Sequence, residues 1–254
     1  MVPLAPSRSA AEGDRIDLRI EMYAVAGLHV MTIHESLAEN ASGYAINVGL
    51  QSRGLADLFA NIQSHTEAQG RIAQDRVYSE TLTSETKRNG KQWRVRASYG
   101  PQGAISGELI PSDEPRTPVT PAQMRGTVDE LTAYYQLERQ LARTGSCVLT
   151  VAVFDGFRRY DLHFSDLEPE VLVADSEHHY AGPTRSCDVM RRKISGFPVD
   201  DHREGIDHGR MWFARLVPGA FMVPVKMEFD TELGLVTAYL AELHGRGINL
   251  ALSD

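Results

Sequence analysis

No apolar run in the sequence approaches the roughly 20 residues that a helix needs to cross a bilayer. Basic tracts are absent as well, since the 26 lysines and arginines are scattered along a chain with 34 acidic residues. The formal net charge of −8 disfavours non-specific binding to nucleic acid and to anionic membrane surfaces. We therefore expect no nucleic-acid partner and no membrane-spanning segment.

Motifs that carry catalytic chemistry are also missing. The sequence has no G-x-S-x-G turn to present a nucleophilic serine and no glycine-rich loop to cradle a phosphate. Its two cysteines lack the paired spacing of zinc sites. Carboxylates are plentiful, but no spacing singles out a pair. We therefore predict no catalytic residue, no metal site and no cofactor.

One stretch, residues 200–208, combines acidic and histidine side chains, and Glu177, His178 and His179 could join it. These residues offer oxygen and imidazole ligands. Their spacing fits no metal motif, however, and Arg203 would oppose a bound cation. A solvated loop is the simpler interpretation, and a hydrolase that uses residues 200–208 stays open as an alternative.

The composition, 42% hydrophobic and 24% charged residues in a chain of 254, is ordinary for a globular protein. Residues 1–13 are predicted to form a flexible leader and residues 14–254 a single β-rich domain. The first seven residues are small and turn-forming, without the charged and apolar regions of a signal peptide. This start is typical of a mature N-terminus behind an added methionine.

Strands are predicted wherever apolar and polar residues alternate, as in residues 16–20 and 44–50. Two hairpins are specified by their turns, at Asn89-Gly90 and at Asp155-Gly156. The first turn places Thr86 opposite Trp93, Ser84 opposite Val95 and Glu85 opposite Arg94. The second places a mostly apolar set on a single face, namely Cys147, Leu149, Val151, Val153, Arg158, Tyr160, Leu162 and Phe164. We expect that face to point into the core.

A single segment, residues 128–143, has the apolar period of an amphipathic helix. Thr127 and Glu130 have capping-box spacing, and Gly145 supplies a stop. The apolar face carries Val128, Leu131, Tyr134, Tyr135, Leu137 and Leu141. We therefore predict a mainly β (α+β) fold, in which a strongly curved antiparallel sheet wraps around one long helix.

Six large side chains are candidates for an apolar ligand cavity beside this helix: Trp93, Leu131, Tyr134, Tyr135, Trp212 and Phe213. For any one of them, ordinary core packing is the favoured interpretation. The cysteines leave two alternatives too. Cys147 and Cys187 each stand at the start of a predicted strand, so they could bridge if those strands are neighbours, or remain two buried thiols.

Several motifs, spread over residues 15–243, together resemble the proteobacterial periplasmic family called domain of unknown function 3108. They include the stretch Tyr-Ala-Val-Ala-Gly-Leu-His-Val at residues 23–30 and the Pro-Val-Thr-Pro run at 118–121. The most specific are Cys147, the segment Val-Phe-Asp-Gly-Phe-Arg-Arg-Tyr-Asp-Leu at 153–162, and Cys187 followed by Ile-Ser-Gly-Phe at 194–197.

This resemblance implies export to the periplasm, a signal peptide that is removed or missing here, and a disulfide between Cys147 and Cys187. It also implies an incompletely closed antiparallel sheet, similar to the open barrel of the lipoprotein-carrier group, with an apolar cavity. The family has no agreed activity, so it assigns no catalytic residue.

The function expected from these features is that of a non-enzymatic periplasmic cell-envelope protein that binds a lipid-like or apolar ligand in the open barrel. A lipid-like molecule or an envelope protein is the expected partner. One alternative is an envelope structural or protein-interaction factor whose core is filled by its own side chains. The other is the hydrolase based on residues 200–208.

Overall fold

The fold is that of a computed structural model, which describes residues 15–54, 61–74, 76–111, 115–174, 180–199, 208–217, 221–231 and 234–252. The predicted leader over residues 1–13 lies outside the described residues. Within them the chain is mainly β. Seven consecutive strands come first: β1 (Arg15–Ala24), β2 (Leu28–Glu39), β3 (Gly43–Ser52), β4 (Ile62–Ala73), β5 (Arg76–Arg88), β6 (Lys91–Gly100) and β7 (Gly103–Ile110).

Helical segments are few in the described part of the chain. A turn of 3-10 helix, η2 (Val25–Gly27), joins β1 to β2, and the helices α2 (Pro121–Met124) and α3 (Glu130–Thr144) follow β7. The remaining strands are β8 (Leu149–Phe154), β9 (Arg159–Asp166), β10 (Glu170–Leu172), β11 (Gly182–Ser195), β12 (His208–Ala214), β13 (Val223–Thr231), β14 (Gly234–Gly245) and β15 (Ile248–Ala251).

All these strands join one antiparallel sheet, in the order β7-β6-β5-β4-β3-β2-β1-β14-β13-β12-β11-β9-β8, with β10 beside β11 and β15 beside β14. The sheet curls round so far that it forms a nearly closed barrel. The seam between its terminal strands, β7 and β8, is not sealed by a continuous ladder. In the described part of the chain the connector at residues 125–128 spans the seam, with isolated bridges from Arg125 to Gly103 of β7 and from Val128 to Val153 of β8. The predicted incompletely closed sheet is therefore confirmed.

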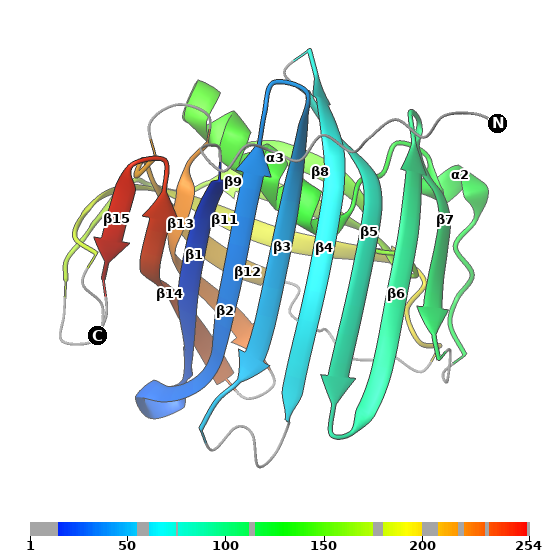
Figure 1. The fold of residues 1–254 in the computed structure, drawn as a ribbon, viewed down its shortest axis with the longest axis horizontal. Helices are drawn as coiled ribbons and strands as arrows, with labels where there is room; N and C mark the ends of the chain where they lie inside the picture. The colour runs from blue at the N-terminus through cyan, green and yellow to red at the C-terminus, as the bar shows by residue number, and fades with distance from the viewer. Residues whose placement is uncertain are drawn as a thin grey trace.

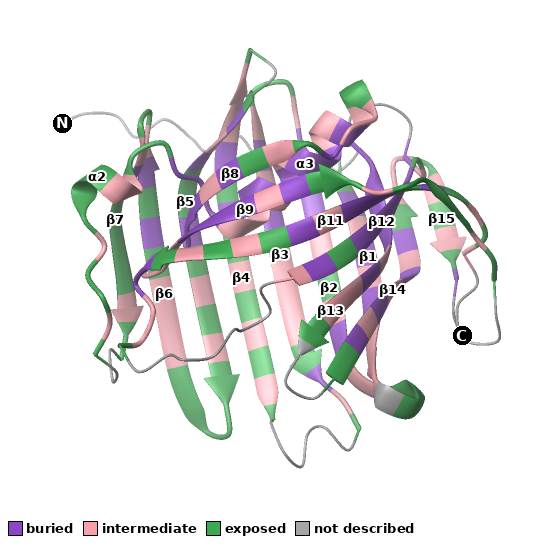
Figure 2. Cartoon of the chain, turned by 180° about the vertical axis from the view of Figure 1, so that it is seen from behind, coloured by how far each residue is buried: buried purple, intermediate pink, exposed green. Residues whose placement is uncertain are grey.

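The two halves of the curled sheet face each other across α3. In Figure 1, β1–β7 form the near layer, while β8, β9, β11 and β12 run across behind them. Buried residues concentrate where these layers meet around α3 (Figure 2). The helix contributes Tyr135, Leu137 and Leu141 to this core, each no more than 2% exposed. Tyr44 of β3 packs against Tyr135, with ring centroids 5.0 Å apart.

The prediction of one long helix is wrong in detail, because the described residues contain two short helices, of 4 and 15 residues. The expected capping box at Thr127 is wrong as well. Thr127 lies at the seam, where its hydroxyl accepts a hydrogen bond from the Ala104 N–H and donates to the Met124 carbonyl. Asp129 caps α3 instead, and its carboxylate accepts from the Thr132 N–H at 2.8 Å. Gly145 ends α3 in a left-handed conformation, as predicted.

The first predicted hairpin register is confirmed, but the second is shifted by two residues, because Phe154 pairs with Arg159 rather than with Phe157. Thr86 pairs with Trp93 and Ser84 with Val95 around the first turn, and Arg94 donates to Glu85 at 2.8 Å. Around the second turn, the expected apolar side chains of β8 and β9 face the core. The alternation of apolar and polar residues does not predict β4. Its inward positions are small or hydroxylated (Ser64, Thr66, Ala68 and Gly70), so the alternation of large apolar side chains is missing.

Cys147 and Cys187 form a disulfide, with their Cα atoms 5.7 Å apart and both side chains fully buried. The positions of the two cysteines in the sheet differ from those expected. Cys187 lies inside β11 rather than at its start, and β9 separates β11 from β8 in the sheet. Cys147 precedes β8 and bonds across the end of β9, where its N–H donates to Asp166 at 2.6 Å. The bond therefore ties the β8 edge to the third strand of the sheet.

Candidate ligand cavity

A cavity of about 530 Å³ lies against the inner face of β3–β7. Its floor follows the cross-strand register. One row consists of Val48, Thr66, Ser84, Val95 and Leu109, which lie opposite one another on five adjacent strands. Trp93 and Thr86 belong to the next row, and Leu82 to the row on the other side. The floor is therefore mostly apolar and is built entirely from regular sheet.

The hydroxyl groups on this floor are hydrogen-bonded to one another. The side chains of Thr66 and Ser84 are hydrogen-bonded at 2.8 Å, and Ser64 and Thr86 form an identical pair at 2.8 Å. Each pair shares one hydrogen bond, so fewer hydroxyl donors are left for a polar ligand atom than the number of hydroxyl groups suggests. The floor therefore offers an apolar ligand a surface of low polarity.

The roof comes from three segments that are far apart in the sequence. Leu131 and Glu130 belong to the first turn of α3, while Asp155, Phe157 and Arg158 belong to the β8–β9 turn and Arg116 to the connector after β7. The strands of the back layer cross β3–β6 near their middle, and the lower ends of these strands extend beyond them (Figure 2). The cavity residues Ser84, Thr86 and Trp93 remain partly exposed and Arg88 is exposed, so the cavity is open to solvent on this side.

Arginines dominate the charges at the roof. Arg158 forms an ion pair with Asp155 at 2.7 Å, and the Asp155 carboxylate also accepts from the Arg158 N–H. Burial alone would lower the pKa of the Arg158 guanidinium, but the charges of Asp155 and other neighbours outweigh it, and that pKa is raised. The guanidinium groups of Arg158 and Arg116 lie 4.8 and 5.0 Å from the ring centroid of Phe157. These contacts hold both cations in place at the cavity.

Acidic groups lie on the opposite side, beyond Val48. Glu35 of β2 pairs with Val48, so its side chain points to the same inner face. Burial raises the pKa of Glu35 to about 7. Burial, with the charges of Glu35 and Glu39, also raises the pKa of Glu138 on α3 well above its usual range. Glu35 therefore lies next to the cavity residue Val48, while the carboxylates that line the cavity itself are those of Glu130 and Asp155.

A family model described as "Protein of unknown function (DUF3108)" matches residues 19–241, which is most of the chain. The chain belongs to the DUF3108 family. No curated protein matches it. A similar solved structure is a "Beta-barrel-like Protein of Domain of Unknown Function DUF1849" from Brucella abortus, with 12% sequence identity and a TM-score of 0.48. That match covers 94% of this chain and 97% of the other.

Two of the six predicted cavity residues line the cavity of this DUF3108 chain, Trp93 and Leu131. The other four lie elsewhere in the packed interior. Tyr134 meets Phe164 edge-on, with ring centroids 5.9 Å apart, and Tyr135 donates a hydrogen bond to Glu39. Phe213 is 1% exposed.

Trp212 has its own set of contacts in the core. Its indole N–H donates to Glu170 at 2.9 Å, and the Lys226 ammonium lies 4.5 Å from its ring centroid. For Trp212 and the three residues above, core packing was the better interpretation.

The hydrolase alternative falls mostly outside the described residues, since residues 200–207 and 175–179 are not among them. Of the stretch 200–208 only His208 is described. It lies on β12, where its ring nitrogens are 2.6 Å from Asp188 and 3.3 Å from Asp230. The part of the chain that the structure describes holds no group of three metal-ligating side chains. None of its helices is long and apolar enough to cross a bilayer.

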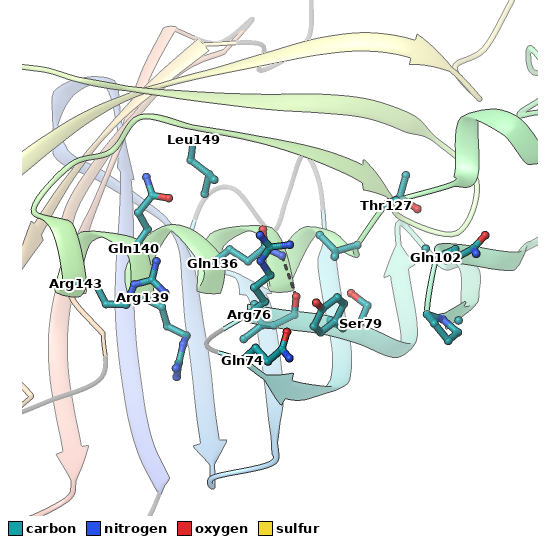
Figure 3. Close-up of a pocket in the computed structure, with 17 residues that line it drawn as sticks. Gln74, Arg76, Ser79, Gln102, Thr127, Gln136, Arg139, Gln140, Arg143 and Leu149 are labelled. Atoms are coloured by element: carbon teal, nitrogen blue, oxygen red, sulfur yellow. Dashed lines mark hydrogen bonds between the residues drawn. The ribbon is translucent and has the colours of Figure 1, made fainter.

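A second pocket of the DUF3108 chain, of about 610 Å³, lies on the opposite, polar face of α3 (Figure 3). Its polar side chains are largely engaged already. Gln136 donates to the Val77 carbonyl at 3.2 Å, Gln140 to the Val148 carbonyl at 2.7 Å, and Arg139 to Glu39 at 3.0 Å. This pocket is therefore a weaker candidate than the apolar cavity.

Sequence reasoning missed the residues that give the cavity its charge, Arg88, Arg116 and Arg158. One signal pointed to the cavity itself: the inward positions of β4 are too small to fill a barrel. The charge had no such signal, because the arginines come from three separate segments that only the curled sheet brings together.

Proposed function

We propose that this DUF3108 chain is a non-enzymatic cell-envelope protein of the periplasm that holds an apolar or lipid-like ligand in its open barrel. The apolar inner-face cavity is the observation that carries the proposal. Ligand sites are typically concave, mostly apolar and about 300–1,000 Å³ in volume, and the cavity of about 530 Å³ falls in that range.

The packed core around α3 also bears on the choice between ligand binding and a filled barrel. Leu137 and Leu141 are fully buried, so the barrel is filled by its own side chains at that level. At the N-terminal turn of α3 the interior is not filled in this way, because Glu130 and Leu131 line the cavity there. This arrangement favours a ligand-binding protein over one whose interior is filled throughout.

The disulfide supports the proposed location. Disulfides persist in oxidising compartments such as the bacterial periplasm and are rare in the cytosol. In this chain both cysteines are consumed by one buried bond. A buried disulfide of this kind is more consistent with export of the chain than with a cytosolic location.

A matched pair of variants tests the proposal. Ser84 lines the cavity, whereas its neighbour Thr83 points to the exposed outer face of β5. Ser84→Trp should fill the cavity, and Thr83→Trp should add the same side chain outside it. Tryptophan suits strand positions, so both variants should fold.

The readout is native mass spectrometry of protein purified from the periplasm, together with binding of the neutral apolar probe N-phenyl-1-naphthylamine. We expect the wild type and Thr83→Trp to bind the probe with similar affinity and Ser84→Trp to lose at least about tenfold. A homogeneous unliganded mass with no probe binding by the wild type, or equal binding by both variants, would count against the cavity as a ligand site.

A further inference from the structure

We propose that the ligand of this cavity carries an uncharged acyl carbonyl, the C=O group of an ester or amide, which accepts a hydrogen bond from the Thr66–Ser84 hydroxyl pair on the floor. The inference rests on the proposed function, because it assumes that the cavity is a ligand site. It adds the chemical class of the ligand and the place where its polar group binds.

Four hydroxyl groups form a narrow polar stripe along β4 and β5. Thr66 lies opposite Ser84, and Ser64 lies opposite Thr86 on the next row of the inner face. Large apolar side chains flank the stripe on both sides, namely Val48 and Leu50 on β3 and Val95 and Trp93 on β6. The floor is therefore polar along this one line, which runs through an apolar surface.

The Thr66–Ser84 pair keeps one donor for a ligand. A hydroxyl has one O–H donor and two acceptor positions. In this pair, joined at 2.8 Å, one hydroxyl donates to the other, so the accepting hydroxyl keeps its own proton. Within the described part of the chain, this is the hydrogen bond that the two side chains form. A ligand that excludes water from the floor must offer an acceptor there, because a buried donor without a partner is costly.

The Thr66–Ser84 pair is better placed for a ligand than its neighbour. Both of its side chains line the cavity, whereas in the second pair Thr86 is the member that does. The second pair shares its row with the partly exposed Trp93 and lies next to the exposed Arg88, so water reaches it at the opening. A ligand in the cavity therefore separates Thr66 and Ser84 from water more completely.

The charged side chains at the roof are stabilised by protein groups, so they do not require a charged ligand. Arg158 forms an ion pair with Asp155 at 2.7 Å. Glu130 lies in the first turn of α3, where the helix dipole favours a negative charge. Arg116 donates to the Gly196 carbonyl at 3.3 Å. An uncharged acceptor suits this site better than an ion, because the ion would lose its hydration on entry.

The apolar part of the lining suits one acyl chain. From the Thr66–Ser84 pair the row continues over Val95 to Leu109, and Leu131 covers the floor from α3. A methylene group and a water molecule have similar volumes, about 30 Å³, so a chain of about 15 carbons fits the cavity. An ester or amide carbonyl on such a chain supplies the acceptor and the apolar body together.

The test is a competition experiment with the full chain, read as displacement of N-phenyl-1-naphthylamine. The neutral ligands are methyl tetradecanoate, N-methyltetradecanamide and pentadecane, presented from one cyclodextrin carrier whose affinity for each ligand is measured separately. Tetradecanoate and tetradecyltrimethylammonium, below their micellar concentrations, add a negative or a positive charge to a similar chain.

We expect the ester, the amide or both to compete about tenfold better than pentadecane, and better than either ion. The ester and the amide offer the same acceptor from two chemical sources, and the tighter of the two identifies the source.

A pair of double variants locates the carbonyl. Thr66→Val with Ser84→Ala removes the hydroxyl pair and nearly keeps its volume. It should weaken the ester and the amide about tenfold and should strengthen pentadecane, because no donor is then buried without a partner. The matched control is Thr81→Val with Ser98→Ala, which removes a cross-strand threonine–serine pair from the exposed outer face of β5 and β6. The control should bind each ligand as the wild type does, and binding of the probe shows that both variants fold.

The outcomes distinguish this inference from the proposed function. Equal competition by the ester, the amide and pentadecane would overturn the carbonyl contact and leave the cavity as an apolar site. Tighter binding of either ion, or a preference for the carbonyl that survives Thr66→Val with Ser84→Ala, would do the same. If no ligand displaces the probe, both the carbonyl contact and the proposed function are wrong.

Discussion

The disulfide allows a quantitative prediction for the double variant Cys147→Ala with Cys187→Ala. The bond closes a loop over a sequence separation of 40 residues. On the loop-entropy model, removing such a cross-link stabilises the unfolded chain by about 4 kcal/mol. Both side chains are fully buried, so the lost sulfur contacts add to that figure rather than offset it. We expect the free energy of unfolding to fall by about 4 kcal/mol or more.

The measurement is equilibrium unfolding in guanidinium chloride, with the oxidised wild type as reference. The variant should also show a larger denaturant slope, because its unfolded chain expands further without the cross-link. The wild type unfolded with reductant is the control and should match the variant to within about 1 kcal/mol. A loss below about 1 kcal/mol, or two alkylated thiols in the unreduced wild type, would refute this account of the bond.

Three further predictions concern the cap of α3, the inner face and the seam. Asp129→Ala removes a fully buried cap that also accepts hydrogen bonds from Ser79 and Thr132, so unfolding in urea should show a loss of about 3 kcal/mol; a loss under 1 would contradict this. Glu35→Gln should stabilise the protein at pH 8 but not at pH 4. The unfolded carboxyl loses its proton near pH 4.5 and the folded one near its pKa of about 7, so wild-type stability falls as the pH rises through that window. An equal effect of Glu35→Gln at both pH values would show that the carboxyl is not desolvated. Gly107→Ala should cost about 1–3 kcal/mol in thermal or urea unfolding, since its Cβ would overlap the Gly156 carbonyl across the seam, whereas Ser106→Ala should be neutral. Equal losses for these two variants would mean that the seam is not closely packed.

Much of the fold could be predicted because it is encoded locally. The turn at Asn89-Gly90 fixes the register of its hairpin. Beside Asp155-Gly156 the alternation sets which residues face the core, although the loop is longer than two residues and the register is shifted. Gly145 ends α3 for an equally local reason, because glycine adopts the left-handed conformation without strain.

The missed features depend on distant neighbours. Thr127 has the spacing of a helix cap, but its hydroxyl is hydrogen-bonded to the Ala104 N–H at the seam. Asp129 therefore caps α3 instead. The strand β4 has small inward side chains because Tyr44 lies over Gly70, Ala68 packs in a small core cluster and Thr66 lines the cavity. Neither fact can be read from a window of a few residues.

The sequence by itself determined the β-rich class, the two hairpins, the helix over most of its length and the burial of Cys147, because each follows from spacing within a short segment. Only the tertiary structure decided which side chains surround the cavity. Trp93 and Leu131 line it, while Tyr135 and Trp212 are packed away from it, although all four are large and apolar or aromatic. The arginines at its mouth come together because the curled sheet brings strand ends, a turn and a connector to one place, and curvature is a property of the whole sheet.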